Sequence, residues 1–129
     1  MVVVGEDKTL YAFDANFLKI AEIKLAHNDP IFTCEYIDDN IVATGDDEGV
    51  IKIWDLRTSV MAFSVEDQKG STTTGIRFDK EPNFMVATNA SGTLGVYDLR
   101  KNDTSQKKLY ALSDEMEEEL NCLELCKVI

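Results

Sequence analysis

The chain has 129 residues and carries 24 acidic against 13 basic side chains, which gives a formal net charge of −11. An acidic surface repels phosphate backbones, so direct nucleic-acid binding is not expected. No apolar run is long enough for a membrane span or a signal peptide, and we expect a soluble intracellular chain with no membrane partner.

Apolar and polar residues alternate along short segments, which is the pattern of β-strands and not of helices. Polar turns containing Gly, Asn or Asp separate these segments, as at Asp46–Gly49 and Asn89–Gly92. In chain order the expected strands are 1–5, 10–14, 18–25, 31–37, 41–45, 50–55, 60–65, 75–79, 84–88, 94–98, 108–112 and 120–129.

One short sequence motif recurs along the chain. An aromatic residue is followed by aspartate at Phe13–Asp14, Trp54–Asp55 and Tyr97–Asp98. The copies are spaced roughly 40 to 45 residues apart, the length of a four-stranded blade of a β-propeller. We therefore predict an all-β fold, a β-propeller of about three blades and twelve strands that form an incomplete ring.

The expected divisions of this partial propeller follow from the strands. Residues 1–26 form the end of one blade, 27–69 a complete blade and 70–112 a complete but degenerate blade. Residues 113–129 form an acidic segment and the first strand of a further blade.

Three blades cannot close a ring, since each blade buries its faces only against its neighbours. Two arrangements would complete the ring. The chain is a fragment of a longer chain of roughly 300 residues, which we favour. Alternatively, two copies form a head-to-tail homodimer in which the strand at 120–129 completes the first blade of the partner copy.

The stretches "AH", "TGDDEG" and "IKIWDLR" within residues 26–57 resemble a WD-repeat unit. In that family a histidine, a Ser or Thr, an acidic residue and a tryptophan form a hydrogen-bonded tetrad within the blade. The resemblance implies that His27, Thr44, Glu48 and Trp54 take those places, with Asp47 as the alternative acid.

Elementary chemistry supports such a tetrad. A buried tryptophan must find an acceptor for its indole N–H, and a histidine can accept on one nitrogen and donate from the other. We expect the tetrad to be structural and not catalytic. In the third unit Tyr97 replaces the tryptophan and Ser91 stands at the acidic position, so this unit is expected to have lost the tetrad.

Nothing in the sequence indicates an enzyme, a cofactor or a metal site. His27 is the single histidine, and no nucleophile elbow, phosphate loop or HExxH pattern is present. The three cysteines, Cys34, Cys122 and Cys126, are expected to be buried free thiols.

Two surface features are candidate partner-binding sites. The family uses a WDxR ending, here Trp54 to Arg57, to engage the adaptor of cullin-based ubiquitin ligases, which implicates Asp55 and Arg57. The second feature is the acidic run 113–120, which would attract a basic partner. Its acidic residues are Asp114, Glu115, Glu117, Glu118 and Glu119.

The order of His27–Arg57, Ala87–Arg100 and the acidic stretch Ser113–Lys127 resembles the WD-repeat proteins of nucleolar ribosome biogenesis. This resemblance implies a noncatalytic scaffold for rRNA processing and large ribosomal subunit assembly. Its partners would be preribosomal proteins, and its location would be the nucleus and nucleolus, with the cytoplasm as a further compartment. The alternative function is a substrate receptor of a cullin-based ubiquitin ligase.

Overall fold

The structure is a computed structural model, and it describes residues 1–67, 69–79, 84–100 and 110–113. Within these residues it contains eleven β-strands in three antiparallel sheets, so the all-β prediction is confirmed. None of the described segments forms a helix long and apolar enough to cross a membrane.

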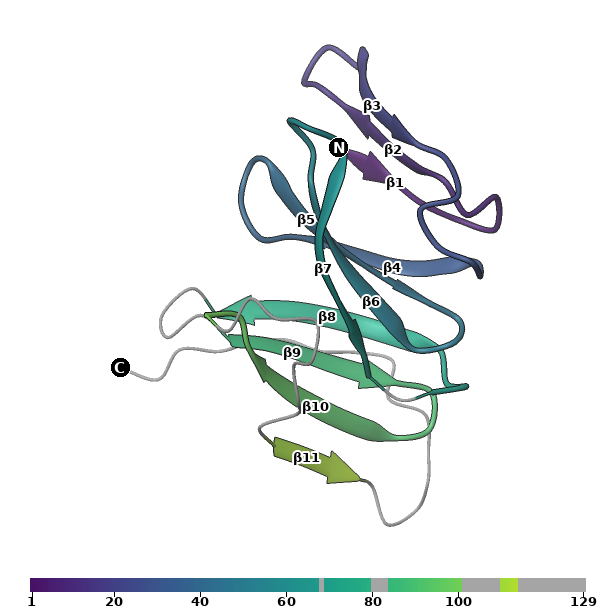
Figure 1. Cartoon of the computed structure of the whole chain (residues 1–129), viewed down its shortest axis with the longest axis vertical. Helices are drawn as coiled ribbons and strands as arrows, with labels where there is room; N and C mark the ends of the chain where they lie inside the picture. Colours follow the sequence, from purple (N-terminus) through teal and green to yellow (C-terminus); the bar gives the residue numbers. More distant parts are fainter. Residues whose placement is uncertain (68, 80–83, 101–109, 114–129) are drawn as a thin grey trace.

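Each sheet is a meander of consecutive strands (Figure 1). The first sheet contains β1 (Val2–Val3), β2 (Leu10–Phe13) and β3 (Lys19–Ile23). The second contains β4 (Ile31–Tyr36), β5 (Ile41–Asp46), β6 (Val50–Asp55) and β7 (Val60–Glu66). The third contains β8 (Thr73–Asp79), β9 (Phe84–Asn89), β10 (Thr93–Asp98) and β11 (Tyr110–Ser113).

Eleven of the expected strands therefore have an observed counterpart. The third sheet begins at Thr73, two residues before the expected start at Gly75. The expected strand at 120–129 lies outside the described residues.

The second sheet lies between the other two and is buried on both faces. Its alternating side chains point to opposite sides, which is how one strand supplies two cores. Between the first and second sheets the buried residues are Leu10, Ala12, Ala21, Ala26, Ile31, Val42, Trp54 and Leu56. Between the second and third sheets they are Ala43, Ile51, Ile53, Phe63, Val65, Ile76, Met85, Ala87 and Tyr97.

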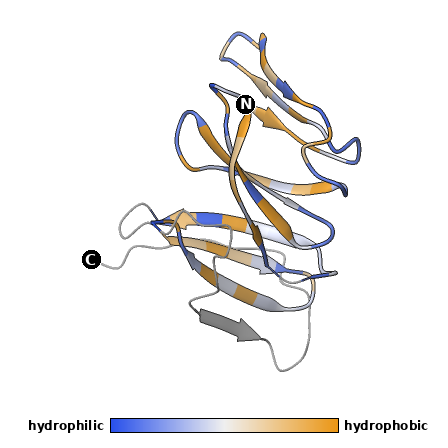
Figure 2. Ribbon diagram, in the orientation of Figure 1, coloured by the Kyte–Doolittle hydropathy of each residue, from blue (hydrophilic) through white to orange (hydrophobic). Residues whose placement is uncertain are grey.

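Hydropathy follows this arrangement. Figure 2 shows apolar colour along the strands and hydrophilic colour at many of the turns. Two turns contain a glycine with positive φ, Gly49 at 86° and Gly92 at 80°, as tight β-hairpin turns require. Lys8 takes the same conformation in the turn of the first sheet, with φ 61°.

The meanders place alternate turns at opposite ends of the sheets. We call one end the Arg57 end; it contains the turns at 14–18, 37–40, 56–59 and the residues 99–100. We call the other the His27 end; it contains the turn at 47–49 and the connections at 24–30 and 67–72. The two ends present different chemistry, as described below.

Gly45 lies where the second sheet is in close contact with the third. A Cβ at this position would lie 2.7 Å from Thr73 Cβ and Cγ2 and 3.0 Å from Thr33 Cγ2. Gly45→Ala is therefore expected to lower the free energy of unfolding by about 1 to 3 kcal/mol through overpacking, measured by urea unfolding. Gly5→Ala is the matched control, because an added Cβ there meets nothing within 4 Å. Equal stability of the two variants would contradict this account.

Candidate functional site

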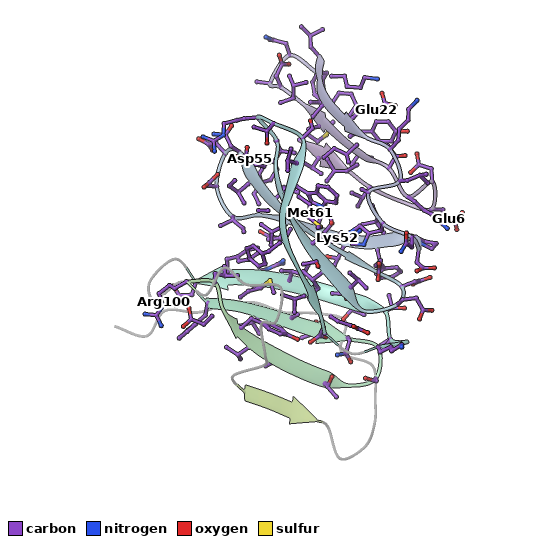
Figure 3. All side chains as sticks on the ribbon, in the orientation of Figure 1. Glu6, Glu22, Lys52, Asp55, Met61 and Arg100 are labelled. Atoms are coloured by element: carbon purple, nitrogen blue, oxygen red, sulfur yellow. The ribbon has the colours of Figure 1, made fainter. Side chains whose placement is uncertain are left out.

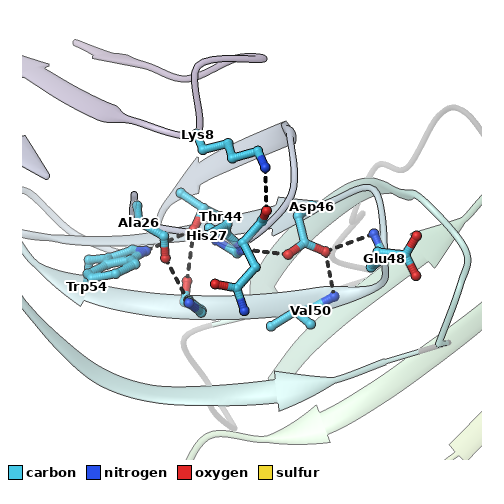
Figure 4. Close-up of polar contacts among 10 residues, drawn as sticks. Lys8, Ala26, His27, Thr44, Asp46, Glu48, Val50 and Trp54 are labelled. Carbon is cyan, nitrogen blue, oxygen red and sulfur yellow. Dashed lines mark hydrogen bonds and ion pairs between the residues drawn. The ribbon is translucent and has the colours of Figure 1, made fainter. Parts of the chain in front are cut away.

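The best-defined polar feature is a buried network between the first and second sheets (Figure 4). Trp54 Nε1–H donates to Thr44 Oγ1 at 2.8 Å. Thr44 Oγ1 lies 2.7 Å from His27 Nε2, and His27 Nδ1 lies 2.7 Å from Asp46 Oδ2. We call these four residues the Trp54 network. All four are buried.

The chemistry of the Trp54 network fixes the direction of donation. An indole N–H can only donate and a carboxylate can only accept. With the imidazole proton on Nδ1, His27 donates to Asp46 and accepts from the Thr44 hydroxyl at Nε2. Each member is then satisfied by the next, as buried polar groups require.

The acidic member of this network is Asp46, so the prediction of Glu48, with Asp47 as alternative, was wrong. Glu48 contributes its backbone N–H, which donates to Asp46 Oδ1 at 3.0 Å, and its side chain is exposed. Asp47 is exposed in the turn, where it accepts a hydrogen bond from Thr72 Oγ1. Asp46 lies two residues after Thr44 on β5 and therefore on the same face of the strand.

The connection that carries His27 is held from both sides. From the first sheet, Lys8 O accepts from Ala26 N at 2.8 Å and Lys8 Nζ donates to Asn28 O at 2.6 Å. From the second sheet, Lys52 Nζ donates to Ala26 O at 2.7 Å and lies 5.9 Å from the Trp54 ring centroid. The imidazole is therefore positioned by two neighbouring sheets.

The third sheet was predicted to have lost the tetrad, and in the equivalent region the structure has a network of different residues. Asp67, in the connection after β7, accepts hydrogen bonds from the Tyr97 hydroxyl and, at 2.9 Å, from Asn89 Nδ2. Asn89 Oδ1 accepts from the N–H groups of Ser91 and Thr93, just as Asp46 Oδ1 accepts from Glu48 and Val50. We call Asp67, Asn89 and Tyr97 the Tyr97 network.

The Tyr97 network uses other residue types for the same task. Burial raises the pKa of the Tyr97 phenol well above its usual value, and the hydrogen bond to Asp67 raises it further. Tyr97 therefore stays protonated and donates, while the Asp67 carboxylate accepts from it. Sequence reasoning missed Asp67 because a carboxylate in a connection has no periodic signal.

The Arg57 end carries two copies of one ion pair. Arg57 donates from Nε to Asp55 Oδ1 at 3.0 Å and from Nη2 to Asp55 Oδ2 at 2.8 Å. Arg100 forms the same two bonds to Asp98, at 2.9 Å and 2.8 Å. The arginine side chains are 63% and 58% exposed, whereas Asp55 is 22% and Asp98 only 9% exposed. The guanidinium groups are therefore the accessible part of each pair.

No family model matches the chain. It is 33% identical to "WD repeat-containing protein 55 homolog" of Drosophila persimilis over 95% of this chain and 24% of that protein. It is also 33% identical to the homolog of the same name from Drosophila melanogaster, with the same coverage. The chain spans about a quarter of the length of these curated relatives.

Two solved structures resemble the fold. The computationally designed Ika8 protein superposes with a TM-score of 0.78 and 23% identity, over 98% of this chain and 37% of that one. The C-terminal WD40 domain of Sif2 superposes with a TM-score of 0.72 and 15% identity, over 91% of this chain and 34% of that one. The chain belongs to the WD-repeat family. Its three sheets are blades of a WD-repeat β-propeller, as predicted.

WD-repeat propellers are interaction scaffolds, and the buried networks of this chain suit that role. Thr44, His27 and Asp46 have the order of a hydroxyl–imidazole–carboxylate triad. However, Thr44 and His27 are fully buried, and the indole N–H of Trp54 already donates a hydrogen bond to the threonine oxygen. A substrate cannot reach this hydroxyl, so the Trp54 network supports the blade and does no chemistry.

The remaining predicted residues of this WD-repeat chain are placed only in part. Cys34 is half-buried and free, and burial raises the pKa of its thiol. Among the described residues no cluster of His, Cys, Asp or Glu could hold a metal ion. Outside the described residues lie Cys122, Cys126, Asp114, Glu115, Glu117, Glu118 and Glu119.

Asp46 makes the stability of this WD-repeat chain depend on pH. Burial raises the pKa of Asp46, but hydrogen bonds from His27, Val50 and Glu48 outweigh burial and hold the pKa below its usual value. The ionised carboxylate therefore stabilises the folded state above the unfolded-state pKa of about 3.9, and this contribution is lost as pH falls through the lower folded-state pKa.

The test compares urea unfolding of the wild type and Asp46→Asn at several pH values. The wild type's advantage in free energy of unfolding should be constant above about pH 4 and shrink below it. The pKa values of Glu22 and Asp55 are also lowered, but both residues are present in both proteins, so their contributions to the difference in free energy of unfolding cancel. An advantage that is independent of pH would contradict the assignment.

Proposed function

We propose that this chain is a noncatalytic scaffold that binds protein partners during rRNA processing and large ribosomal subunit assembly, in the nucleus and nucleolus. The observation that carries the proposal is the 33% identity to curated relatives named WD repeat-containing protein 55 over 95% of the chain. It agrees with the resemblance of His27–Arg57 and Ala87–Arg100 to WD-repeat proteins of nucleolar ribosome biogenesis. The whole protein's partners and location form part of the proposal.

The physical basis is a rigid framework with exposed turns. The strands are fixed by two apolar cores, and side chains on turns cap the backbone, as Asp38 Oδ1 does for the N–H groups of Asn40 and Ile41. Turns held in this way lose little conformational entropy when a partner binds. The net charge of −11 favours basic partners at long range, which is suitable for preribosomal proteins.

The first experiment expresses the tagged chain in cells and separates the extract on a sucrose gradient. We expect the chain to sediment with large-subunit precursors and to concentrate in the nucleolus when fused to a fluorescent protein. Sedimentation only with free proteins, together with exclusion from the nucleolus, would overturn the proposal.

A matched pair of variants tests the acidic contribution. Neutralising the five acids of the run 113–120 to amides should weaken the association with precursors. These are Asp114, Glu115, Glu117, Glu118 and Glu119. The control neutralises five acids elsewhere, at Glu6, Asp29, Asp39, Glu48 and Glu66. Equal effects of the two variants would show that only the total charge matters.

The second candidate function is a substrate receptor of a cullin-based ubiquitin ligase. The observation that favours it is the exposed guanidinium of Arg57, held in a fixed orientation by Asp55. Trp54 itself is buried in its network and is not accessible to an adaptor. Arg57→Ala should abolish capture of the adaptor and leave precursor association intact, whereas Arg100→Ala should keep capture of the adaptor. Capture that survives Arg57→Ala would exclude this candidate.

A further inference from the structure

A hollow of about 390 Å³ opens between the second and third blades at the Arg57 end. Neither the Trp54 network nor the Tyr97 network reaches it. Six of its lining residues are apolar: Ile37, Ile41, Ile53, Ala62, Phe63 and Leu99. A hollow of this size and composition can hold a bulky apolar side chain, the usual anchor of a protein interface.

Arg100 is the charged residue that lines the hollow. Its Nε and Nη2 are bound to Asp98, and its guanidinium lies 5.8 Å from the Phe84 ring centroid. The Asp98 carboxylate is shielded behind it, at 9% exposure, while the Arg100 side chain is 58% exposed. The ion pair thus presents its positive end at the mouth of the hollow. Arg100 lies on the left side of Figure 3.

A second guanidinium lies beyond the same wall. Ile41 lines both this hollow and a smaller neighbouring one that contains Arg57. Arg57 is held by Asp55 in the same geometry and is equally accessible. Asp55 and Arg100 lie on the same side of the molecule in Figure 3.

The frame of the hollow is fixed before any partner arrives. Ile37 N donates to Ile41 O at 2.8 Å, and Ile41 N donates to Asp38 Oδ1 at 2.9 Å, which closes the turn that forms one wall. The opposite wall follows β10 and is fixed by the bonds of Arg100 to Asp98. A site held in this way binds without a large ordering cost.

We propose that this hollow binds a short peptide segment of a partner protein, in which a bulky apolar side chain stands next to an aspartate or glutamate. The apolar side chain enters the hollow, and the carboxylate accepts a hydrogen bond from the free edge of the Arg100 guanidinium. Charge complementarity selects the acid, because none of the described residues that line the hollow is a carboxylate and a basic side chain would face Arg100. The inference rests on the proposed scaffold function and names one of its binding sites.

The net charge of −11 does not exclude an acidic ligand here. Surface charges farther away than about 8 Å are largely screened at physiological ionic strength, so the nearest groups decide. Those groups are the exposed guanidinium of Arg100, the shielded carboxylate of Asp98, and Asp38, whose Oδ1 already accepts from the N–H groups of Asn40 and Ile41. Because the net negative charge of the chain repels an acidic ligand at long range, only a ligand that fits the hollow well binds, which makes the site selective.

The probe is a phage-displayed library of random peptides, selected against the immobilised chain. We expect enrichment of sequences that pair Leu, Ile, Met or Phe with a neighbouring Asp or Glu. An enriched peptide is then synthesised with a fluorescent label, and its affinity is measured by fluorescence anisotropy. A second peptide with the acids replaced by amides should bind at least about tenfold more weakly.

Two variants of the chain locate the site. Ala62 is exposed on β7, so Ala62→Trp can fold and should fill the hollow and abolish binding. Arg100→Glu should weaken binding at least about tenfold. Lys69→Glu, an equal charge reversal at the His27 end, should leave binding unchanged. Circular dichroism and the thermal midpoint confirm that each variant is folded.

Several results would overturn the inference. They are a selection that enriches no peptides, enriched peptides without an acid, or binding that survives Ala62→Trp and Arg100→Glu in folded protein. Failure of the proposed function is distinguishable. If peptides bind as expected but the chain does not sediment with large-subunit precursors, the hollow is a docking site and the assembly role is wrong. If the chain sediments with precursors but no peptide binds, the assembly role stands and the docking site is wrong.

Discussion

Asp46→Ala is expected to lower the free energy of unfolding by about 3 kcal/mol, whereas Glu48→Ala should change it by less than about 0.5 kcal/mol. Asp46 is buried and accepts three hydrogen bonds, from His27 Nδ1 and from the N–H groups of Glu48 and Val50. Alanine leaves these donors without an acceptor, and each buried unsatisfied group costs about 1 to 3 kcal/mol.

Urea unfolding followed by far-ultraviolet circular dichroism measures this difference. Trp54, the only tryptophan of the chain, gives a second signal from within the network. Glu48→Ala is a matched control because it removes a carboxylate from the same turn. Similar losses for the two variants would show that total charge on the turn matters, and that Asp46 is not the acidic member of the network.

Asp67→Ala is expected to lower the free energy of unfolding by about 2 to 3 kcal/mol. The change removes the acceptor of the Tyr97 hydroxyl and of the Asn89 amide, both of which are fully buried. Glu66→Ala is the control, since Glu66 precedes Asp67 in the chain and is exposed. It should change stability by less than about 0.5 kcal/mol.

A double-mutant cycle decides whether Asp67 acts through Tyr97. Tyr97→Phe should cost less than Asp67→Ala, because Asp67 keeps its hydrogen bond from Asn89. The double variant should be more stable than the sum of the two single losses implies, by at least about 0.5 kcal/mol, as expected for residues in contact. Strictly additive losses would show that the two residues act independently.

The fold was predictable because local and global signals agree in this chain. Period-two alternation along Ile51 and Ile53 indicates a strand. The aromatic–aspartate motif at Trp54–Asp55 marks the end of the third strand of the blade. The residues at which strands begin were less predictable. β8 begins at Thr73 because it follows β9 as far as Asn89, and that pairing leaves no pattern in the segment itself.

Three members of the Trp54 network were predictable, but its acid was not. His27, Thr44 and Trp54 were identified from the resemblance to a WD-repeat unit, whereas the acid was placed at Glu48, with Asp47 as the alternative. The structure extends β5 one residue past its expected end, so Asp46 shares the face of Thr44, while Asp47 and Glu48 belong to the turn. Asp67 had no signal in the sequence, because it replaces a histidine with a carboxylate from a connecting segment.

The two networks have a consequence for protein engineering. In the second blade a nitrogen base accepts from a hydroxyl, and in the third a carboxylate accepts from a phenol. Both aromatic residues donate, Trp54 from its indole N–H to the Thr44 hydroxyl and Tyr97 from its phenol to Asp67, but the donating atom stands at a different place on each ring. Exchanging one aromatic residue between the blades would therefore leave the donor out of reach of the acceptor in the new blade. A chimeric ring made from these repeats should tolerate transplantation of a whole blade together with the connection that precedes it, and reject single-residue grafts.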